Sequence, residues 1–242
     1  MSKVSGMLGK LPAKQLPMGT ISAYVEGELP KPPNSFDYAH KVTTGFPMAA
    51  NDKYGDCTIA GVIHMLQLAY AEVGEEFKYP GDDAVVETYL RLTNGADSGL
   101  VMVDVLKEWT TKGLFGVKLA AWAPINKDDW EEMRAAAYCF GGLYVGIEVP
   151  ANAPIQFEHN QDWHLTEDSG EVVGGHCVTI SGLSRFGADV ETWGDETGMT
   201  KGWWGVYGSE VFGIIPEVFV DKNHGPIENI NIKALQQDLM NL

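Results

Sequence analysis

Cys57 is the residue of this chain best placed to act as a nucleophile. It ends the run Asn51-Asp52-Lys53-Tyr54-Gly55-Asp56-Cys57 and stands directly before a stretch with helical periodicity. A thiol reacts as its thiolate, and the first turn of a helix favours the thiolate through free N–H groups and the positive end of the helix dipole. The same N–H groups can donate to an oxyanion that forms on an attacked carbonyl. Taken alone, Cys57 is better explained as a small buried apolar side chain, as most free cysteines are.

Three further residues are candidate partners of this thiol. His176 follows two glycines at the start of an alternating apolar run, and Glu191 lies one predicted strand further on, where an antiparallel neighbour would return beside the histidine. Asn51 offers a side-chain amide as a second oxyanion donor, and Gly55 permits a tight turn between Asn51 and Cys57. Together these residues are the parts of a thiol nucleophile with its acid–base partner.

This order of motifs resembles the papain-like cysteine peptidases. That family has a cysteine at a helix start with a Gln upstream, then a histidine strand, then an Asn-Ser-Trp-Gly segment. The matching segments here are Asn51 to Cys57, the strand from Gly175 to Gly182, and Glu191-Thr192-Trp193-Gly194. Two residues depart from the family pattern: Asn51 replaces the Gln, and Glu191 replaces the Asn of the third segment.

The resemblance implies a role for each matched residue. Cys57 would be the nucleophile, His176 the acid–base group, Glu191 the residue that orients the imidazole, and Asn51 an oxyanion donor. Gly55, Gly175 and Trp193 would line the substrate site. A thiolate–imidazolium pair is expected, because a carboxylate at Glu191 would raise the pKa of the histidine.

The periodicity predicts an α+β protein, because helices dominate the first half and strands the second. With the resemblance, we expect a helical lobe that carries the Cys57 helix, packed on a curved antiparallel sheet that carries His176 and Glu191. The predicted helices cover residues 58–73, 83–92, 100–113, 128–138 and 232–242, and the predicted strands cover residues 142–149, 177–183, 188–193, 203–207 and 218–220.

Three regions are expected along the chain: an extended N-terminal arm (1–45), the peptidase-like domain (46–225) and a C-terminal tail (226–242). The arm is rich in Gly and Pro, with a possible short strand around Ser22 to Val25. It is open to interpretation as a pro-segment or as an arm that docks on a neighbouring copy. Its short, loop-like character favours plain packing along the body.

Composition limits the partners. The chain has 242 residues, 45% of them hydrophobic, so it can bury a full core, and its formal charge of −16 speaks against nucleic acid or an anionic membrane as main partner. No apolar run reaches the length of a signal peptide or a membrane span, which predicts a cytoplasmic protein, with a virion as an alternative. An odd count of three cysteines argues against a disulfide framework, so Cys139 and Cys177 are expected as buried free thiols.

No cofactor or metal is expected. A polar stretch before the histidine strand lacks the compact spacing of metal ligands; it contains His159, Asp162, His164, Glu167 and Asp168. The sequence also has no P-loop or dinucleotide fingerprint. His64 lies too far along the Cys57 helix to act on the same substrate and is expected to be structural.

Three functions follow from these residues. The first is a cysteine peptidase or amidase that cuts a peptide or a peptide-like amide. The second is a catalytically altered protein of the same fold that serves in a virion or another assembly, which the two departures and the arm favour. The third is a cell-wall amidase, although no separate wall-binding module is visible.

Overall fold

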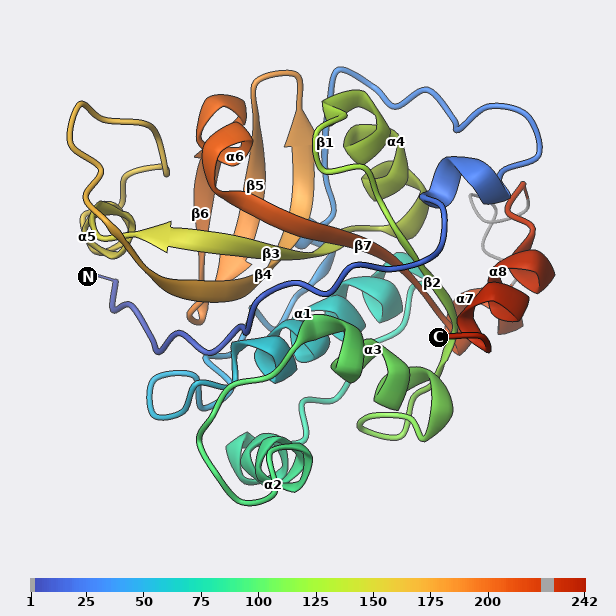
Figure 1. Cartoon of the computed structure of the whole chain (residues 1–242), viewed down its shortest axis with the longest axis horizontal. Coiled ribbons are helices and arrows are strands. Elements are labelled where there is room, and N and C mark those ends of the chain that lie inside the picture. The colour runs from blue at the N-terminus through green and yellow to red at the C-terminus, as the bar shows by residue number, and fades with distance from the viewer. Residues whose placement is uncertain (1–2, 223–228) are drawn as a thin grey trace.

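One antiparallel sheet forms the centre of the protein. The computed structural model describes residues 3–222 and 229–242, and in these residues seven strands pair in the order β2-β7-β3-β4-β5-β6, with β1 joined to the end of β4 (Figure 1). The strands are β1 (Ser35–Asp37), β2 (Leu119–Pro124), β3 (Leu143–Pro150), β4 (Val172–Ser184), β5 (Gly187–Thr192), β6 (Asp195–Thr200) and β7 (Gly208–Pro216).

Helices cover both faces of this sheet. α1, α2 and α3 lie on one side, with α1 directly against β4 and β3, whereas α4 and α6 lie on the other side (Figure 1). α5 follows β3, and α7 and α8 lie beside β2 and β7. The helices are α1 (Cys57–Glu72), α2 (Asp82–Leu92), α3 (Met102–Thr111), α4 (Trp130–Phe140), α5 (Asn152–Glu158), α6 (Lys201–Tyr207), α7 (Glu217–Asp221) and α8 (Ile232–Leu239). The predicted α+β architecture is confirmed.

The helix that begins at Cys57 is buried along most of its length. The amides of Ile59 and Ala60 both donate to the carbonyl of Asp56, so the helix begins directly after this residue. It ends before Gly74, whose φ of 75° lets Glu75 N–H return to the carbonyl of Tyr70 at 2.8 Å. The helix lies between the sheet and the outer helices, so almost all of its faces, not a single stripe, are apolar and buried.

Two apolar clusters fill the core of the protein. One contains α1 with the side chains of α2 and α3, and Cys57 belongs to it. The other contains α4 and a group of buried tryptophans that includes Trp163, Trp193 and Trp203. The tryptophan-rich segment is therefore core. Cys57 belongs to one cluster and Trp193 to the other, so the candidate site contains residues of both, and we call the two clusters the two lobes.

Two segments predicted as strands are helical, and five elements were missed. Residues 203–207 and 218–220 were expected as strands but are helical, in α6 and α7. Thr200 caps α6 by accepting from Trp203 N–H at 3.2 Å, which starts a helix where the sequence suggested a strand. The missed elements are β1, β2, α5, β6 and β7; β7 is buried over most of its length and lacks the polar alternation of a half-exposed strand.

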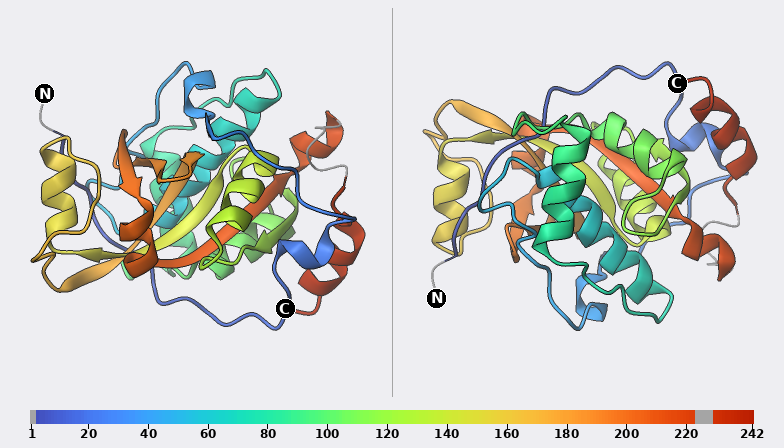
Figure 2. Two further views of the ribbon diagram at one scale, coloured as in Figure 1. Left: turned by 90° about the horizontal axis from the view of Figure 1, so that it is seen from above. Right: turned by 90° about the horizontal axis from the view of Figure 1, so that it is seen from below.

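The arm runs the length of the molecule, from α5 to α8 (Figures 1 and 2). Ser5 Oγ donates to Glu158 at 2.7 Å in α5, and Val25 pairs with Ile230 just before α8. A 3₁₀ helix, Ile21–Tyr24, replaces the strand expected there, and a second one covers Ala39–Lys41.

The C-terminal helix expected from residue 232 is present as α8, while residues 226–228 of the predicted tail fall outside the described residues. Among the described residues, no helix combines the length and apolar character needed to cross a membrane.

Candidate active site

The structure brings Cys57 and the His176 strand together. Cys57 is the first residue of α1 and is 1% exposed. Its Sγ accepts a hydrogen bond from the backbone N–H of Cys177 at 3.4 Å. Because Cys177 follows His176 on β4, the thiol lies against the backbone that carries the imidazole.

The imidazole of His176 is held by two consecutive residues, Thr192 and Trp193. Its Nε2 lies 2.7 Å from Thr192 Oγ1, and its ring stacks on the Trp193 indole with centroids 4.7 Å apart and planes 27° apart. Trp193 and Gly194 form the two-residue turn between β5 and β6 with φ of 48° and 71°. Such left-handed pairs fit the twist of a hairpin, and this one sets the indole against the imidazole.

Glu191 does not make the contact that the sequence predicted. Its Oε1 accepts from Ser181 Oγ at 2.8 Å, and its buried Oε2 has no hydrogen-bond partner among the described residues. Neighbouring residues of a strand point to opposite faces, so Thr192 reaches the imidazole and Glu191 points away from it. Burial raises the pKa of Glu191 to about 8, so the group is mostly a neutral carboxylic acid at pH 7. Its catalytic role stays a prediction.

Thr192 is the contact that sequence reasoning missed. It belongs to the matched Glu191-Thr192-Trp193-Gly194 segment, so the motif was found but the neighbouring residue was chosen. The hydroxyl next to the tryptophan was the available signal, because it can bond a ring nitrogen at short range.

Asn51 lies beside the thiol helix and donates to peptide carbonyls. Its buried Nδ2 donates to Tyr54 O at 3.0 Å and to Met7 O at 3.1 Å, and the Met7 N–H donates back to the Asn51 carbonyl at 2.6 Å. The left-handed residues Ala49 and Ala50, with φ of 54° and 63°, form the turn that precedes it. The predicted oxyanion donor is therefore oriented to hold a carbonyl of a peptide segment.

That peptide segment is the N-terminal arm, which crosses the site between the two lobes (Figure 1). On one wall, Leu100 N–H donates to Gly9 O and Leu11 N–H donates to Leu100 O, each at 2.9 Å. On the other wall, Lys10 N–H donates to Gly175 O at 3.0 Å. We call residues 6–11 the cleft segment. The composition of the arm favoured simple packing along the body, but this part of the arm lies in the candidate site itself.

All three predicted substrate-site residues touch the cleft segment. A Cβ added to Gly9 would lie 1.7 Å from Gly55 O, and a Cβ added to Gly175 would lie 2.4 Å from Lys10 O. A Cβ on Gly6 would lie 2.6 Å from Trp193 Cδ1. Gly9 therefore allows the closest approach of the segment to the loop before Cys57. A groove of about 390 Å³ continues along the segment, next to Gly99 and Gly174.

Burial keeps the catalytic candidates uncharged in this arrangement. It raises the pKa of Cys57 to about 11, and it lowers the pKa of His176 to about 3. Asp56, buried beside the thiol, has its pKa raised to about 7, also by burial. The expected thiolate–imidazolium pair is thus replaced by a neutral thiol and a neutral imidazole, both of them buried.

The other candidates have structural surroundings. Burial lowers the pKa of His64 to about 4, and its Nε2 contacts Pro47 O at 2.8 Å, in keeping with a structural role. Cys139 and Cys177 are free and buried, as predicted. In residues 3–222 and 229–242, no group of three or more His, Cys, Asp or Glu side chains is arranged to hold a metal ion.

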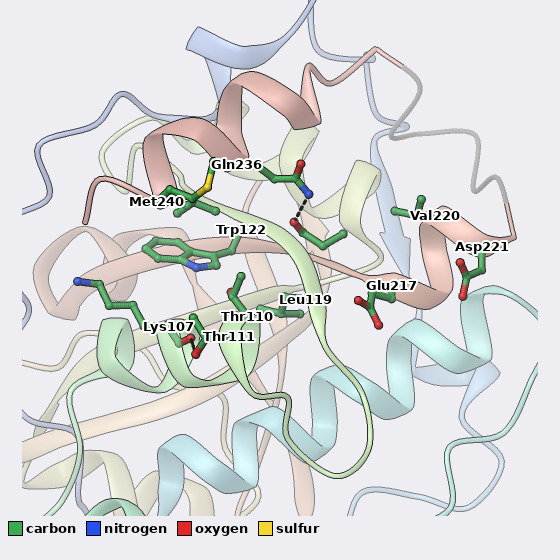
Figure 3. A pocket seen from close by; sticks show the side chains of 12 residues that line it. Lys107, Thr110, Thr111, Leu119, Trp122, Glu217, Val220, Asp221, Gln236 and Met240 are labelled. Atoms are coloured by element: carbon green, nitrogen blue, oxygen red, sulfur yellow. Dashed lines mark hydrogen bonds between the residues drawn. The ribbon is translucent and has the colours of Figure 1, made fainter.

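A larger hollow of about 750 Å³ opens elsewhere on the protein, between α3, β2, α7 and α8 (Figure 3). The side chain of Gln236 crosses one side of it and donates to Ala120 O at 2.8 Å. Its lining includes Trp122 and Met240 but none of the predicted site residues and no residue of the cleft segment.

Comparison with known proteins identifies the fold. No family model matches the sequence, and no curated protein sequence matches it. Among solved structures, xylellain, a cysteine protease from Xylella fastidiosa, is similar with a TM-score of 0.65 at 13% identity, over 89% of this chain and 97% of that one. Procathepsin B from Trypanosoma congolense is similar with a TM-score of 0.62 at 12% identity, over 88% and 86%.

A third similar structure is the ragweed pollen cysteine protease Amb a 11 in its proform, with a TM-score of 0.59 at 14% identity, over 78% and 68% of the two chains. All three are cysteine proteases, and their TM-scores lie between 0.59 and 0.65. The chain therefore has the papain-like cysteine protease fold.

Proposed function

We propose that this protein is a cysteine peptidase that cuts an extended peptide bound between its two lobes. One observation carries the proposal: the cleft beside Cys57 already binds an extended peptide backbone, through hydrogen bonds to Leu100 on one wall and Gly175 on the other. Main-chain hydrogen bonds of this kind recognise a polypeptide irrespective of its side chains. The similar structures, all cysteine proteases, support the same class of reaction.

The residues support acyl transfer in two steps. His176 takes the thiol proton, and Cys57 Sγ attacks the carbonyl carbon of the substrate amide, with Asn51 Nδ2 and the helix-start N–H donating to the oxyanion. The C–N bond then breaks, and the leaving amine takes the proton from His176. Water adds to the thioester, the C–S bond breaks, and a carboxylic acid and the free thiol result. Trp193 and Thr192 keep the imidazole in place.

The arrangement described here is a closed form, because the cleft segment occupies the place of the substrate. Leaving the cleft would admit water to Cys57 and His176 and so remove much of the burial that keeps both groups neutral. Peptidase activity therefore requires that the segment moves out, either displaced by substrate or cut.

The test compares the full chain with its Cys57→Ala variant on fluorescently quenched, denatured casein. We expect hydrolysis by the unchanged chain and a loss of at least about 1000-fold in the variant, because the nucleophile is removed. Cys139→Ala is the matched control: this free, buried cysteine lies in α4, outside the cleft, and its loss should leave turnover unchanged.

If the unchanged chain shows no turnover, the Gly9→Ala variant distinguishes a blocked cleft from an inactive site. Its new Cβ would collide with Gly55 and so weaken the binding of the arm. Turnover in Gly9→Ala but not in the unchanged chain would mean that the arm keeps substrate out of the cleft, and the proposal would stand. Absence of turnover in both proteins would overturn it. The second candidate, a non-catalytic assembly protein of this fold, would then stand, as the neutral state of Cys57 and His176 favours.

A further inference from the structure

Two of the three cysteines lie side by side where α1 packs on β4. The backbone N–H of Cys177 donates to Cys57 Sγ at 3.4 Å, so standard bond lengths place the two Cα atoms within about 7 Å of each other. Disulfides join cysteines whose Cα atoms are separated by up to about this distance. Both residues belong to the same apolar cluster, whereas Cys139 belongs to the other.

The Cys177 thiol is turned toward the helix that carries Cys57. A Cβ added to Gly61 would lie 3.1 Å from Cys177 Sγ. Gly61 follows Cys57 by four residues on α1, and residues four apart share a helix face, so both sulfur atoms lie between this face and β4. Burial raises the pKa of Cys177 well above its ordinary value, and the nearby Cys57 raises it further. The missing side chain at Gly61 leaves the space that the sulfur occupies.

A second thiol in this position can rescue an oxidised nucleophile. A hydroperoxide converts a cysteine thiolate into a sulfenic acid, and a thiol within reach turns the sulfenic acid into a disulfide. Disulfides are opened again by thiol–disulfide exchange. Without a neighbouring thiol, further peroxide carries the sulfenic acid on to a sulfinic acid, which ordinary thiols do not reduce.

We propose that Cys57 and Cys177 form a reversible disulfide when a hydroperoxide oxidises the protein, with Cys177 as the resolving cysteine. The Cys57 thiolate attacks one oxygen of hydrogen peroxide, the O–O bond breaks, and the hydroxide released takes up the proton that the thiol had lost. The Cys177 thiol then attacks the sulfur of the sulfenic acid, the S–O bond breaks, and water leaves with the thiol proton. Two thiols are oxidised and one peroxide is reduced to two molecules of water.

The disulfide would control the proposed peptidase, because it removes the thiol that attacks the substrate. This consequence rests on the proposed function, whereas formation of the disulfide does not. Cys57 is 1% and Cys177 3% exposed in the closed form, so we expect slow oxidation there and faster oxidation once the arm is loosened. Gly9→Ala, whose new Cβ collides with Gly55, provides the loosened form.

The test treats the full chain and Gly9→Ala with hydrogen peroxide and then alkylates the remaining thiols with iodoacetamide in denaturant. Intact mass and peptide mapping show which cysteines are linked. We expect one pair of peptides joined through Cys57 and Cys177, lighter than the two free peptides by two hydrogen atoms and separated again by dithiothreitol. Cys139→Ala is the matched control and should form the same link, since this free cysteine lies in the other cluster.

Cys177→Ala distinguishes a resolving cysteine from an uninvolved neighbour. After peroxide and then dithiothreitol, we expect at least about threefold less alkylatable Cys57 in this variant than in the unchanged chain, because its sulfenic acid proceeds to sulfinic acid. Cys177→Ser, which keeps the volume of the side chain, should behave in the same way. Equal amounts of sulfinic acid with and without Cys177 would overturn the proposal, as would the absence of the link from both the unchanged chain and Gly9→Ala.

Failure of this inference and failure of the peptidase give different results. A Cys57–Cys177 link in a protein that does not hydrolyse casein, with or without Gly9→Ala, would keep the redox pair and remove the enzyme. Casein hydrolysis that peroxide abolishes without forming the link, and that dithiothreitol does not restore, would keep the enzyme and overturn the redox pair.

Discussion

At the scale of single residues, the hydrogen bond of His176 decides which ring nitrogen is free to accept a proton. When Nε2 donates to Thr192 Oγ1, Nδ1 carries the lone pair that can accept a proton. Nδ1 is buried and has no hydrogen-bond partner in the described part of the chain. A hydroxyl partner, unlike a carboxylate, adds no charge that favours the imidazolium, so burial prevails and the pKa of His176 falls.

Thr192→Val tests this assignment. The substitution keeps the shape of the side chain but removes the oxygen at 2.7 Å from Nε2. We expect kcat on casein to fall about 10- to 100-fold with little change in KM. The imidazole would lose its orientation, whereas the contacts that bind the substrate would be unchanged. Thr192→Ser should restore most of the rate. The matched control is Thr197→Val on β6, whose hydroxyl contacts Gln161 O and not the imidazole; an equal loss there would argue for a general structural effect.

The sequence located the neighbourhood of the site but not its contacts. Cys57, His176 and Asn51 were found because their motifs are local: a helix start, a strand after glycines and a turn. The choice between Glu191 and Thr192 depends on which face of β5 meets β4, and this is set by pairing between strands distant from the turn. A shift of one residue reverses the two side chains, and nothing in the local pattern fixes it.

At the scale of elements, the N-terminal arm behaves like an added strand. Residues 9 to 11 bond to Leu100 on one wall and to Gly175 on the other, so the cleft segment is held by main-chain contacts on both sides. Because the segment is part of the same chain, its effective concentration at the cleft is high, of the order of millimolar for a short linker. A substrate from solution must compete with that advantage.

Gly9→Ala should weaken this hold. The new Cβ would lie 1.7 Å from the backbone oxygen of Gly55, and backbone cannot give way as a flexible side chain can. We expect iodoacetamide to alkylate Cys57 at pH 7 at least about tenfold faster than in the unchanged chain, since thiolate formation no longer suffers full burial. The midpoint of the rate–pH curve should fall below the value near pH 11 that the closed form implies.

Peptide mapping by mass spectrometry locates the label on Cys57. Gly205→Ala is the control, because nothing lies within 4 Å of its new Cβ. Unchanged alkylation in Gly9→Ala would show that the cleft segment does not limit access to the thiol.

Elements were predictable where their pattern was long. The helix at Cys57 and the helices α2 to α4 have long apolar periods, and their ends lie within a few residues of those expected. For short buried segments the sequence does not distinguish a helix from a strand. β2 and β7 are apolar on both faces, and a run such as residues 203–207 fits a helix as well as a strand. The path of the arm could not be predicted at all, since Gly and Pro mark turns but not the surface on which they pack.

At the scale of the whole molecule, buried titratable groups link folding to pH. The raised pKa of Glu191, about 8 against 4.5 when exposed, means that the folded protein keeps a proton that the unfolded chain loses over this interval. The free energy of unfolding therefore decreases as pH rises from about 4.5 to 8, by at most about 1.4 kcal/mol per pH unit from this group.

Glu191→Gln should flatten this pH dependence. A neutral amide does not titrate and can still accept from Ser181, so the variant should lose less stability between pH 5 and 8 than the unchanged protein does. Urea unfolding followed by tryptophan fluorescence at several pH values measures the slope. Glu87→Gln, on an exposed residue of α2, is the control, and parallel slopes for the unchanged protein and Glu191→Gln would contradict the assignment.

The close approach of the arm to the loop before Cys57 has an evolutionary consequence. A Cβ on Gly9 would lie 1.7 Å from Gly55 O, and a Cβ on Gly55 would lie 2.9 Å from Leu8 O, so neither glycine can gain a side chain while the arm keeps its place. A substitution at either position would therefore loosen the cover over Cys57. Sequences that descend from this one are expected to keep both glycines or to change them together, so that the arm and the loop diverge as a pair.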